Sequence, residues 1–407
     1  MMNIYLIAKK LSHSFSPQIH SRLASYNYKL CPLLPEELPQ FFKERNFDGL
    51  NVTIPYKTEV INYLDDISPE AREIGAVNTV VNRGGVLTGY NTDYYGFMYA
   101  VKRSGIDVCG KKAVVIGGGG ASKPVCLALG ALGTQSVRVL THKLNTPETL
   151  PQFFDAQVLV NASPVGMYPE NGKAPVNLED FSHCEGVIDL IYNPSLTALL
   201  LDARARGIKY ENGLSMLVAQ AKRACEIFTG SDIEDDVIET VRKDVESETK
   251  NIIIVGMPGS GKTTVGELVS KKLNRKFCDC DKFLEENGTS PAETIKSKGE
   301  AFFRKEETEA LSHLCSQSGL VISTGGGAVT VKENYGILHQ NGFVVYLSRG
   351  EEFLETAGRP LSLKNGVQTL FKEREPLYES FSDIKIPNDT TPEGAAQKIV
   401  DSFLRRK

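Results

Sequence analysis

The sequence predicts an α/β protein of at least two domains, with parallel sheets in its central and C-terminal parts. A chain of 407 residues is longer than a single hydrophobic core usually supports. Two apolar, β-rich runs, 112–116 and 251–255, each lead directly into a glycine-rich loop. Further short apolar strands at 137–140, 158–160 and 186–189 alternate with helical stretches. This alternation is typical of a parallel sheet with helices on its faces.

The elements outside those sheets are predicted from the same patterns. The chain opens with an expected strand at 3–7 and a helix from Ser16. In the segment 231–250, apolar residues recur at helical spacing up to Val245, which predicts a helix, but the last residues are polar. We therefore expect a linker at 241–250 and a separate C-terminal domain at 251–407.

Composition excludes several classes of protein. Charged residues make up 24% of the chain and the net charge is −4, so we expect no nucleic-acid partner, which would need a basic face. The sequence contains neither a membrane-length apolar run nor a signal-peptide pattern, so we expect no membrane partner. The eight cysteines form no CxxC pair, which favours reduced thiols, a cytoplasmic location and no zinc site. No feature indicates an oligomeric state.

The C-terminal glycine loop is the most specific motif. Residues 256–263 fit G-x-x-x-x-G-K-[ST] completely and lie between an expected strand and an expected helix. In such a loop, backbone amides at Gly259 and Gly261 converge on phosphate oxygens, with the following helix N-terminus and Thr264 beside them. Lys262 would reach the β- and γ-phosphates and Thr263 would ligate Mg²⁺. ATP is therefore the expected cosubstrate.

Later residues of this block suggest how a second substrate is bound. Asp279 and Asp281 are two apart at an expected strand end, so both should point to one face. Asp279 could hold the metal through water, and Asp281 could accept a substrate hydroxyl. Taken alone, Arg304 in its Glu-rich helix is more readily a surface ion pair than a ligand. The glycines 325–327 would let a ligand approach the backbone closely.

Together these motifs resemble shikimate kinase. GxxxxGKT, DxD, GExxFR, GGG, GRPL and R-x-PLY occur in that order over residues 251–406. The resemblance implies a P-loop kinase-type domain with a parallel sheet. It also implies that Asp281 orients or deprotonates the reacting hydroxyl and that Gly326 shapes the ring pocket. The implied arginine roles are binding of the shikimate carboxylate by Arg304 and Arg374, and stabilisation of the transferring phosphoryl group by Arg359.

The kinase part departs from that family in one segment. The stretch between Leu347 and Arg359 is shorter than the family's usual lid and is rich in glutamate, with Glu351, Glu352 and Glu355. A short acidic lid bears on closure over ATP more than on shikimate binding.

The central glycine loop is a weaker signal. Gly117, Gly119 and Ser122 match the dinucleotide fingerprint G-x-G-x-x-G/A only in part, with Gly118, Gly120 and Ala121 between them. The second strand of this unit ends in Thr141, His142 and Lys143 rather than in a carboxylate. A carboxylate there favours NAD and a basic group favours the 2′-phosphate of NADP, so these residues moderately favour NADPH.

A third group of polar residues is scattered through the sequence before and after this loop, between residues 14 and 220. Ser14 and Ser16 are two apart before a helix, and alone Ser16 followed by Pro17 fits a helix N-cap. The remaining candidates are Asn51, Thr53, Lys57, Asn78, Asp93 and Gln220. Taken alone, Lys57 could be a surface cation near a turn and Asp93 a turn-forming aspartate.

These segments resemble shikimate dehydrogenase over residues 3–240, through HSxSP, NVTxPxK, GAVNT, NTD and GxxMLxxQA. The resemblance implies a substrate domain at 1–100, completed by 213–240, and an inserted Rossmann-like NADP domain at 101–212. It implies that Ser14 and Ser16 bind the substrate carboxylate and that Lys57 and Asp93 are the acid–base pair. Their chemistry fits that role, because a lysine beside a carboxylate can deliver a proton to a ketone oxygen as hydride arrives at carbon. The residues implied to hold ring hydroxyls are Asn51, Thr53, Asn78 and Gln220. Ala8 and Lys10 replace the family's usual Gly and Pro, and Thr141-His142-Lys143 replaces its Asn-Arg-Thr, which leaves the choice between NADPH and NADH open.

The sequence thus predicts a bifunctional enzyme that reduces 3-dehydroshikimate to shikimate with NADPH and then phosphorylates shikimate to shikimate 3-phosphate with MgATP. Two alternatives stay open. The dehydrogenase could act on quinate, which differs by one hydroxyl. Alternatively, one half could be a non-catalytic or regulatory module.

Overall fold

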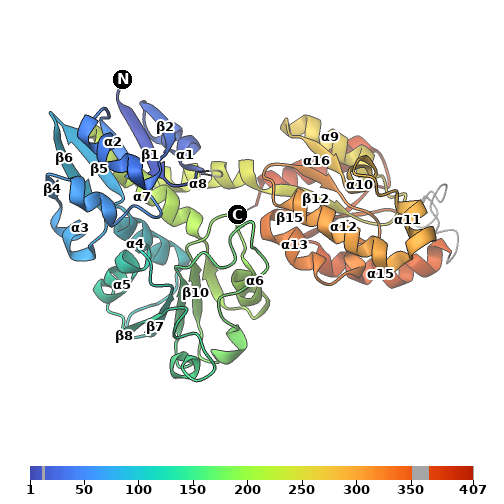
Figure 1. Ribbon diagram of the computed structural model, residues 1–407. Coiled ribbons are helices and arrows are strands. Elements are labelled where there is room, and N and C mark those ends of the chain that lie inside the picture. Colours follow the sequence, from blue (N-terminus) through green and yellow to red (C-terminus); the bar gives the residue numbers. More distant parts are fainter. Residues whose placement is uncertain (12–13, 351–365, 407) are drawn as a thin grey trace. The chain divides into compact units, whose positions relative to one another are not determined.

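The computed structural model describes residues 1–11, 14–350 and 366–406. The chain divides into two compact units, Met1–Val245 and Glu246–Lys407, which are described separately below (Figure 1). Within the described residues, no helix is long and apolar enough to cross a membrane.

The first unit begins with a six-stranded mixed sheet in the order β2-β1-β3-β5-β6-β4. Its strands are β1 (Asn3–Ala8), β2 (Asn27–Pro32), β3 (Gly49–Val52), β4 (Asp66–Ile67), β5 (Thr79–Arg83) and β6 (Val86–Tyr90). Three short helices accompany it: α1 (Ser16–Leu23), α2 (Leu38–Glu44) and α3 (Pro69–Ile74). Helix α7 (Gly213–Thr229) returns from much later in the chain, and its Ala224 and Phe228 share a core with Ile4 and Val81 of this sheet.

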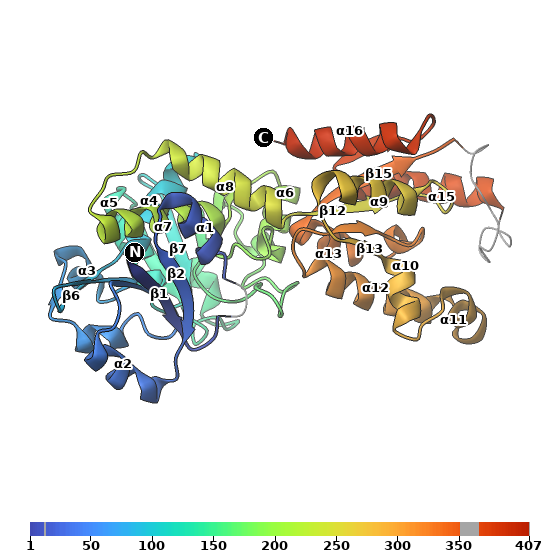
Figure 2. The same cartoon turned by 90° about the horizontal axis from the view of Figure 1, so that it is seen from above.

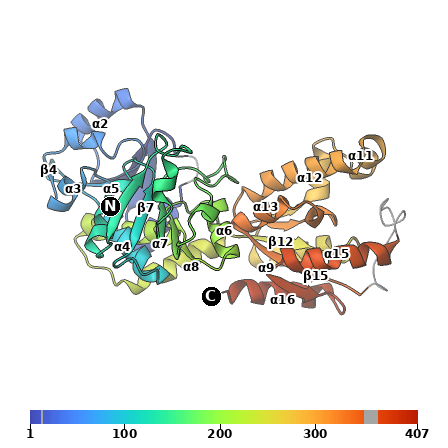
Figure 3. The ribbon, with the colours of Figure 1, turned by 90° about the horizontal axis from the view of Figure 1, so that it is seen from below.

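The second sheet of the first unit is fully parallel, in the order β11-β10-β9-β7-β8. Its strands are β7 (Lys112–Ile116), β8 (Ser136–Leu140), β9 (Val158–Asn161), β10 (Gly186–Asp189) and β11 (Lys209–Glu211). Helices α4 (Asp93–Ser104) and α5 (Ser122–Ala131) share a core with Ala113 and Val115. Helix α6 (Ala198–Ala205) shares one with Val114 and Ile116, so alternate residues of β7 face opposite helix layers (Figure 3). Successive strands run outward from β7 in both directions, which makes the β7/β9 edge a topological switch point.

The segment expected as a linker at 241–250 is instead helical up to Thr249, where α8 (Asp236–Thr249) ends. Ile238, Val241 and Val245 are buried in one core with residues of α7. These residues are spaced i, i+3, i+7 and form one apolar face, which stabilises a helix where the polar residues had suggested a linker.

The second unit is a five-stranded parallel sheet in the order β13-β14-β12-β15-β16. Its strands are β12 (Asn251–Val255), β13 (Phe277–Asp279), β14 (Val321–Ser323), β15 (Gly342–Ser348) and β16 (Ile384–Pro387). Helices α9 (Lys262–Leu273) and α16 (Pro392–Leu404) cover one face and share a core with Ile252 and Ile254. The opposite core, around Ile253 and Val255, is formed with α10 (Cys280–Glu286), α12 (Glu300–Cys315), α13 (Asn334–Asn341) and α15 (Val367–Phe381), while α11 (Pro291–Lys298) lies beside α12 (Figure 2).

Candidate active sites

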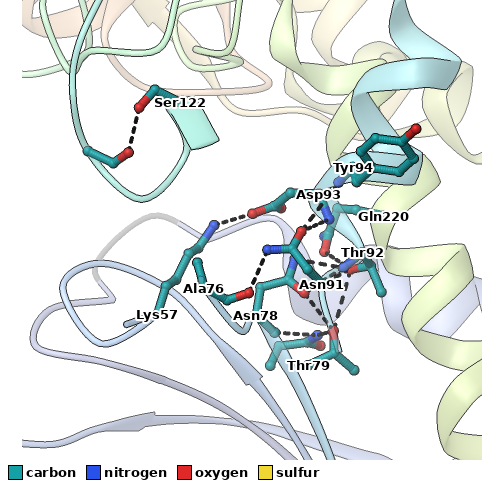
Figure 4. Close-up of polar contacts among 12 residues, drawn as sticks. Lys57, Ala76, Asn78, Thr79, Asn91, Thr92, Asp93, Tyr94, Ser122 and Gln220 are labelled. Atoms are coloured by element: carbon teal, nitrogen blue, oxygen red, sulfur yellow. Dashed lines mark hydrogen bonds and ion pairs between the residues drawn. The ribbon is translucent and has the colours of Figure 1, made fainter. Parts of the chain in front are cut away.

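Lys57 and Asp93 form a close ion pair in the first unit. Lys57 lies in the turn after β3, where its carbonyl accepts the Val77 N–H at 2.7 Å. Asp93 is the first residue of α4. Lys57 Nζ lies 2.6 Å from Asp93 Oδ2, and the two side chains are only 14% and 8% exposed (Figure 4). The pair therefore combines a proton donor and a carboxylate that holds it in place.

Thr92, which precedes Asp93, and side chains from two further segments converge next to this pair. The Thr92 N–H donates to Asn78 Oδ1 at 2.8 Å, and Asn78 Nδ2 donates to Thr92 Oγ1 at 3.1 Å. The Thr92 hydroxyl also lies 3.2 Å from Gln220 Oε1 on α7 (Figure 4). The structure thus brings Asn78 and Gln220, distant in sequence, into one polar cluster beside Lys57 and Asp93.

Asn51, at the end of β3, joins this cluster from the neighbouring strand. It is buried, and its Nδ2 donates to Thr79 Oγ1 at 3.3 Å. Its Oδ1 accepts from the Tyr28 hydroxyl at 3.0 Å. Thr53 follows on the loop after β3, with its N–H bonded to the Ile7 carbonyl at 3.1 Å. β3 therefore delivers both predicted residues to the same end of the sheet.

The interpretation of Ser16 as a helix N-cap is wrong. The N-cap of α1 is Phe15, and no side chain caps this helix. Ser16 is buried, its N–H donates to Ser14 Oγ at 3.2 Å, and its side chain lies close enough to the Tyr28 phenol to affect the pKa of that phenol. Ser16 is instead the first residue of the helix, and Pro17, whose missing N–H needs no cap, follows it in the first turn. The Ser16 side chain therefore does not cap the helix.

The central glycine loop lies at the switch point between β7 and β9. Gly117 has φ +111°, and a Cβ there would lie 2.9 Å from the Ala162 carbonyl oxygen after β9. Ser122 Oγ donates to the Gly119 carbonyl at 2.7 Å where α5 begins. A Cβ on Gly120 would lie 3.7 Å from Lys57 Cβ, so the loop passes beside the ion pair. Ligands of open α/β sheets bind at this position, outside the carboxyl ends of the strands.

The residues after β8 lie next to this loop. A Cβ on Gly118 would lie 3.1 Å from Thr141 Cγ2, and His142 and Lys143 are exposed. An exposed imidazole and ammonium group beside a dinucleotide-type loop fit a phosphate-bearing ribose better than a carboxylate would.

In the second unit, the phosphate-binding loop runs from β12 into α9. Gly259 and Gly261 have φ values of +87° and +91°, which favour glycine and turn the backbone into a cradle. Lys262 is 9% exposed, and its Nζ donates to the carbonyls of Gly256 and Met257 at 2.9 and 3.0 Å. The loop therefore has the form that binds phosphate at a helix N-terminus.

Thr263 and Asp279 meet beside this loop. The Thr263 hydroxyl donates to Asp279 Oδ2 at 2.7 Å, and a hydroxyl with a carboxylate oxygen is a donor set suited to Mg²⁺. The prediction that both aspartates lie on a strand end is wrong for Asp281. Asp279 ends β13 and caps α10, accepting the Asp281 N–H at 3.1 Å, so Asp281 lies in the first helical turn. Burial and the Asp279 carboxylate raise the pKa of Asp281.

Arg304 combines the ion pairs expected of it with a buried position. Its Nη1 lies 2.6 Å from Glu307 Oε2 and its Nη2 lies 3.0 Å from Glu300 Oε1. The Arg304 side chain is 11% exposed, and a Cβ on Gly327 would lie 2.0 Å from its Nη2. Arg304 is therefore fixed against the triple-glycine loop rather than lying on the surface.

Arg374, from α15, reaches the same loop, and its Nη1 donates to the Gly326 carbonyl at 3.2 Å. A cavity of about 500 Å³ connects these groups with the phosphate loop. Its lining includes Gly259, Gly261, Lys262, Thr263, Thr264, Asp279, Asp281, Arg304, Gly325, Gly326, Gly327 and Arg374. The structure thus gathers in one cavity all the kinase-side residues predicted from the sequence that it describes.

Comparisons with known proteins assign both units. A family model described as the shikimate dehydrogenase substrate binding domain matches residues 6–80, and a shikimate kinase model matches residues 258–404. A shikimate dehydrogenase (NADP(+)) of Caldanaerobacter subterraneus is 40% identical over 266 residues, which are 58% of this chain and 95% of that protein. The chain belongs to the shikimate dehydrogenase family. Residues 258–404 add a shikimate kinase domain, so the polypeptide carries two enzymes of one pathway.

Solved structures agree with the dehydrogenase assignment. Shikimate dehydrogenase 1 from Peptoclostridium difficile superposes with a TM-score of 0.56 at 36% identity, covering 60% of this chain and 98% of that one. The enzyme from Thermus thermophilus, solved with NADP(H) and shikimate, gives 0.55 at 33% identity, covering 60% and 99%. These structures confirm the predicted Rossmann-like fold of the dehydrogenase, and the shikimate kinase model at residues 258–404 supports the P-loop sheet of the second unit.

Sequence reasoning missed three residues at these shikimate enzyme sites. Glu307 is fully buried and orients Arg304, yet in the sequence it is one glutamate among many. Arg349 lines the kinase cavity and its Nη1 donates to the Gly259 carbonyl at 3.2 Å. Tyr28 contacts Asn51 and Ser16 but belongs to no recognised motif. The predicted Arg359 and the acidic segment with Glu351, Glu352 and Glu355 lie outside the described residues.

Proposed function

We propose that this chain reduces 3-dehydroshikimate to shikimate with NADPH and phosphorylates shikimate to shikimate 3-phosphate with MgATP. The observation that carries the proposal is the presence, in one chain, of the Lys57–Asp93 pair beside a dinucleotide-type loop and of an arginine-lined cavity that opens onto a phosphate loop. The product of the first reaction is the substrate of the second, which gives the fusion a chemical rationale.

In the reduction, Lys57 acts as the general acid. Its Nζ donates a proton to the ketone oxygen as hydride reaches the carbon, and Asp93, 2.6 Å away, holds the ammonium group in place. Ser14 and Ser16 bind the substrate carboxylate. Four residues hold the ring hydroxyls and thereby orient the carbonyl towards Lys57: Asn51, Thr53, Asn78 and Gln220.

The residues proposed to hold NADPH are Gly117, Gly118, Gly119, Gly120, Ala121, Thr141, His142 and Lys143. The fit is supported by the close approach of Gly117 to the Ala162 carbonyl, which leaves no room for a Cβ, and by the exposed basic residues after β8. When bound, this cofactor supplies the hydride. Residues 141–143 lack the family's arginine, which would bind the 2′-phosphate through two hydrogen bonds at once. His142 and Lys143 can bind this phosphate only through single hydrogen bonds, and these decide the preference for NADPH over NADH.

In the phosphorylation, Asp281 accepts the proton of the attacking hydroxyl while Arg304 and Arg374 bind the shikimate carboxylate beside Gly326. Gly259, Gly261, Lys262, Thr263 and Thr264 hold the ATP phosphates. Thr263 and Asp279 hold Mg²⁺, a fit supported by their 2.7 Å contact, and the metal neutralises phosphate charge when bound. Arg359 stabilises the transferring phosphoryl group.

The domain boundaries belong to the same proposal. Residues 1–100 with 213–240 form the dehydrogenase substrate domain, 101–212 the NADP domain and 251–407 the kinase. Packing of α7 against Ile4 and Val81 supports the return of the chain to the first domain.

A crossed pair of variants tests this assignment. Lys57→Ala is expected to lower NADPH-dependent reduction by about 10²–10⁴-fold, the usual contribution of a general acid, and to leave shikimate phosphorylation unchanged. Lys262→Ala is expected to abolish phosphorylation and to leave reduction unchanged. The two rates are measured separately in the full chain, from NADPH absorbance and from ADP release. Loss of both activities in either variant, or of neither, contradicts the assignment.

A further inference from the structure

Tyr28 connects two residues that the proposed dehydrogenase site uses for different parts of the substrate. It lies on β2, an edge strand that carries none of the family motifs. Its hydroxyl donates to Asn51 Oδ1 at 3.0 Å. Burial raises the pKa of the phenol, and the side chain of Ser16 lies close enough to the phenol to oppose this larger effect. One phenol thus contacts both the carboxylate-binding serine and the hydroxyl-binding amide.

The hydrogen bond from Tyr28 fixes the orientation of the Asn51 amide, that is, the positions of its Oδ1 and Nδ2 atoms. Asn51 is 5% exposed, and its Nδ2 donates towards Thr79 Oγ1 and the Asn78 carbonyl at 3.3 and 3.4 Å. Among the described residues, only Tyr28 is recorded as donating to Oδ1. An amide has two donor hydrogens and two acceptor lone pairs, so these contacts use both hydrogens and leave one lone pair of Oδ1 to accept a hydrogen bond from a ligand hydroxyl. Without the phenol, a buried acceptor loses its partner and the amide is free to turn over.

The ring of Tyr28 is held independently of its hydroxyl. The fully buried His20 stacks on it, with ring centroids 4.1 Å apart and planes 15° from parallel. Burial lowers the pKa of His20 to about 3, so the stacked imidazole is neutral. Removal of the hydroxyl alone should therefore leave the aromatic packing of this region intact.

We propose that Tyr28 is a positioning residue that fixes the Asn51 amide, and with it Ser16, so that the dehydrogenase pocket distinguishes ring hydroxyls. This inference rests on the proposed dehydrogenase function. Tyr28 acts through its two neighbours, so it determines substrate affinity and selectivity and leaves proton transfer from Lys57 unaffected.

The test is Tyr28→Phe in the full chain. The KM for shikimate in the NADP⁺-dependent oxidation should rise by about tenfold, as expected when a buried acceptor loses its donor, while kcat and the KM for NADP⁺ change little. With a shikimate analogue that lacks the hydroxyl held by Asn51, the two proteins should have the same KM. A general disturbance of folding would instead lower kcat and cofactor affinity as well.

Tyr26→Phe is a matched control from the same strand region. The Tyr26 hydroxyl lies 2.5 Å from His20 Nδ1 and 2.8 Å from Cys225 Sγ, and no contact with Asn51 is recorded for it. This variant should retain the wild-type KM. In a double-mutant cycle, Tyr28→Phe should add nothing to the KM increase caused by Asn51→Ala, because both changes remove the same interaction.

An unchanged KM in Tyr28→Phe, additive effects in the cycle, or an equal KM increase in Tyr26→Phe would overturn the inference. Failure of the underlying function is recognised separately, because the unmodified chain would then fail to oxidise shikimate at all. Shikimate phosphorylation by the same samples should be equal in all variants and reports the amount of folded kinase.

Discussion

At the scale of single residues, three consecutive glycines explain how the kinase site is assembled. A Cβ on Gly325 would lie 2.2 Å from Glu307 Oε1, one on Gly326 would lie 2.6 Å from the Pro258 ring, and one on Gly327 would lie 2.0 Å from Arg304 Nη2. Each position therefore contacts a different group of the cavity. The glycines are required by close approach, since none of the three has a positive φ that would demand glycine.

This close packing makes Gly327→Ala a specific probe of shikimate binding. The new methyl group must displace the Arg304 guanidinium, which also forms ion pairs with Glu300 and Glu307. The displaced Arg304 could then no longer bind the shikimate carboxylate as proposed. We expect the KM for shikimate in the kinase reaction to rise by about 10–100-fold, the effect of losing a charge-assisted hydrogen bond. The KM for ATP and the dehydrogenase rate should stay unchanged, and steady-state kinetics of both reactions measures all three. A selective rise in the KM for ATP would show that Arg304 serves the nucleotide instead.

At the scale of helices and strands, parallel strands place both sites at their carboxyl ends. The loop after β7 lies against Ala162, the residue that follows β9. The loops after β12 and after β14 lie close together and both line the kinase cavity. In the dehydrogenase unit, Asp189 stabilises the carboxyl ends of the strands through hydrogen bonds. Its carboxylate accepts from Thr197 Oγ1 at 2.7 Å, and from the Ile191 N–H and Asn161 Nδ2 at 3.0 Å each. It thereby joins the ends of β9 and β10 to the start of α6.

The buried Asp189 should make the stability of this unit depend on pH. Burial raises its pKa from the usual 3.8 to about 6, despite the opposing hydrogen bonds. The folded unit therefore binds this proton more tightly than the unfolded chain. The contribution of Asp189 to the free energy of unfolding should be greatest below about pH 4 and fall by about 3 kcal/mol as the pH rises to 6 and beyond.

Hydrogen exchange in increasing urea, followed on peptides from β9 and β10 of the full chain, measures this dependence. Comparison with Asp189→Asn isolates the contribution of the carboxylate, because the amide cannot ionise. The difference in stability between the two proteins should change across pH 4–6 and be constant above it. A constant difference over the whole range would mean that Asp189 titrates with its ordinary pKa.

At the scale of the whole molecule, the sequence was sufficient for both folds because their glycine loops and strand patterns are local. The conformation of the loop at 256–263 depends only on its own backbone angles and on the helix that follows. It can therefore be predicted from eight consecutive residues. The helical end of α8 was not predicted, since its polar residues resemble a linker until the burial of Val241 and Val245 is known. For the same reason a helix N-cap stayed open as one interpretation of Ser16 taken alone, because its neighbour Tyr28 lies on a different element, β2.

Residues whose role depends on tertiary contacts could not be predicted from the sequence for the same reason. Nothing in the local pattern distinguishes Glu307 from the surrounding glutamates, and only its burial against Arg304 identifies it. Arg349 and Tyr28 likewise become site residues only when distant segments meet.

The most direct test of the central claim is a single reaction with the full chain, 3-dehydroshikimate, NADPH, ATP and Mg²⁺, with the products identified by mass spectrometry. The account predicts shikimate 3-phosphate, with one NADPH oxidised and one ATP consumed per molecule formed. Accumulation of unphosphorylated shikimate would contradict the kinase assignment. Unreacted 3-dehydroshikimate would contradict the dehydrogenase assignment.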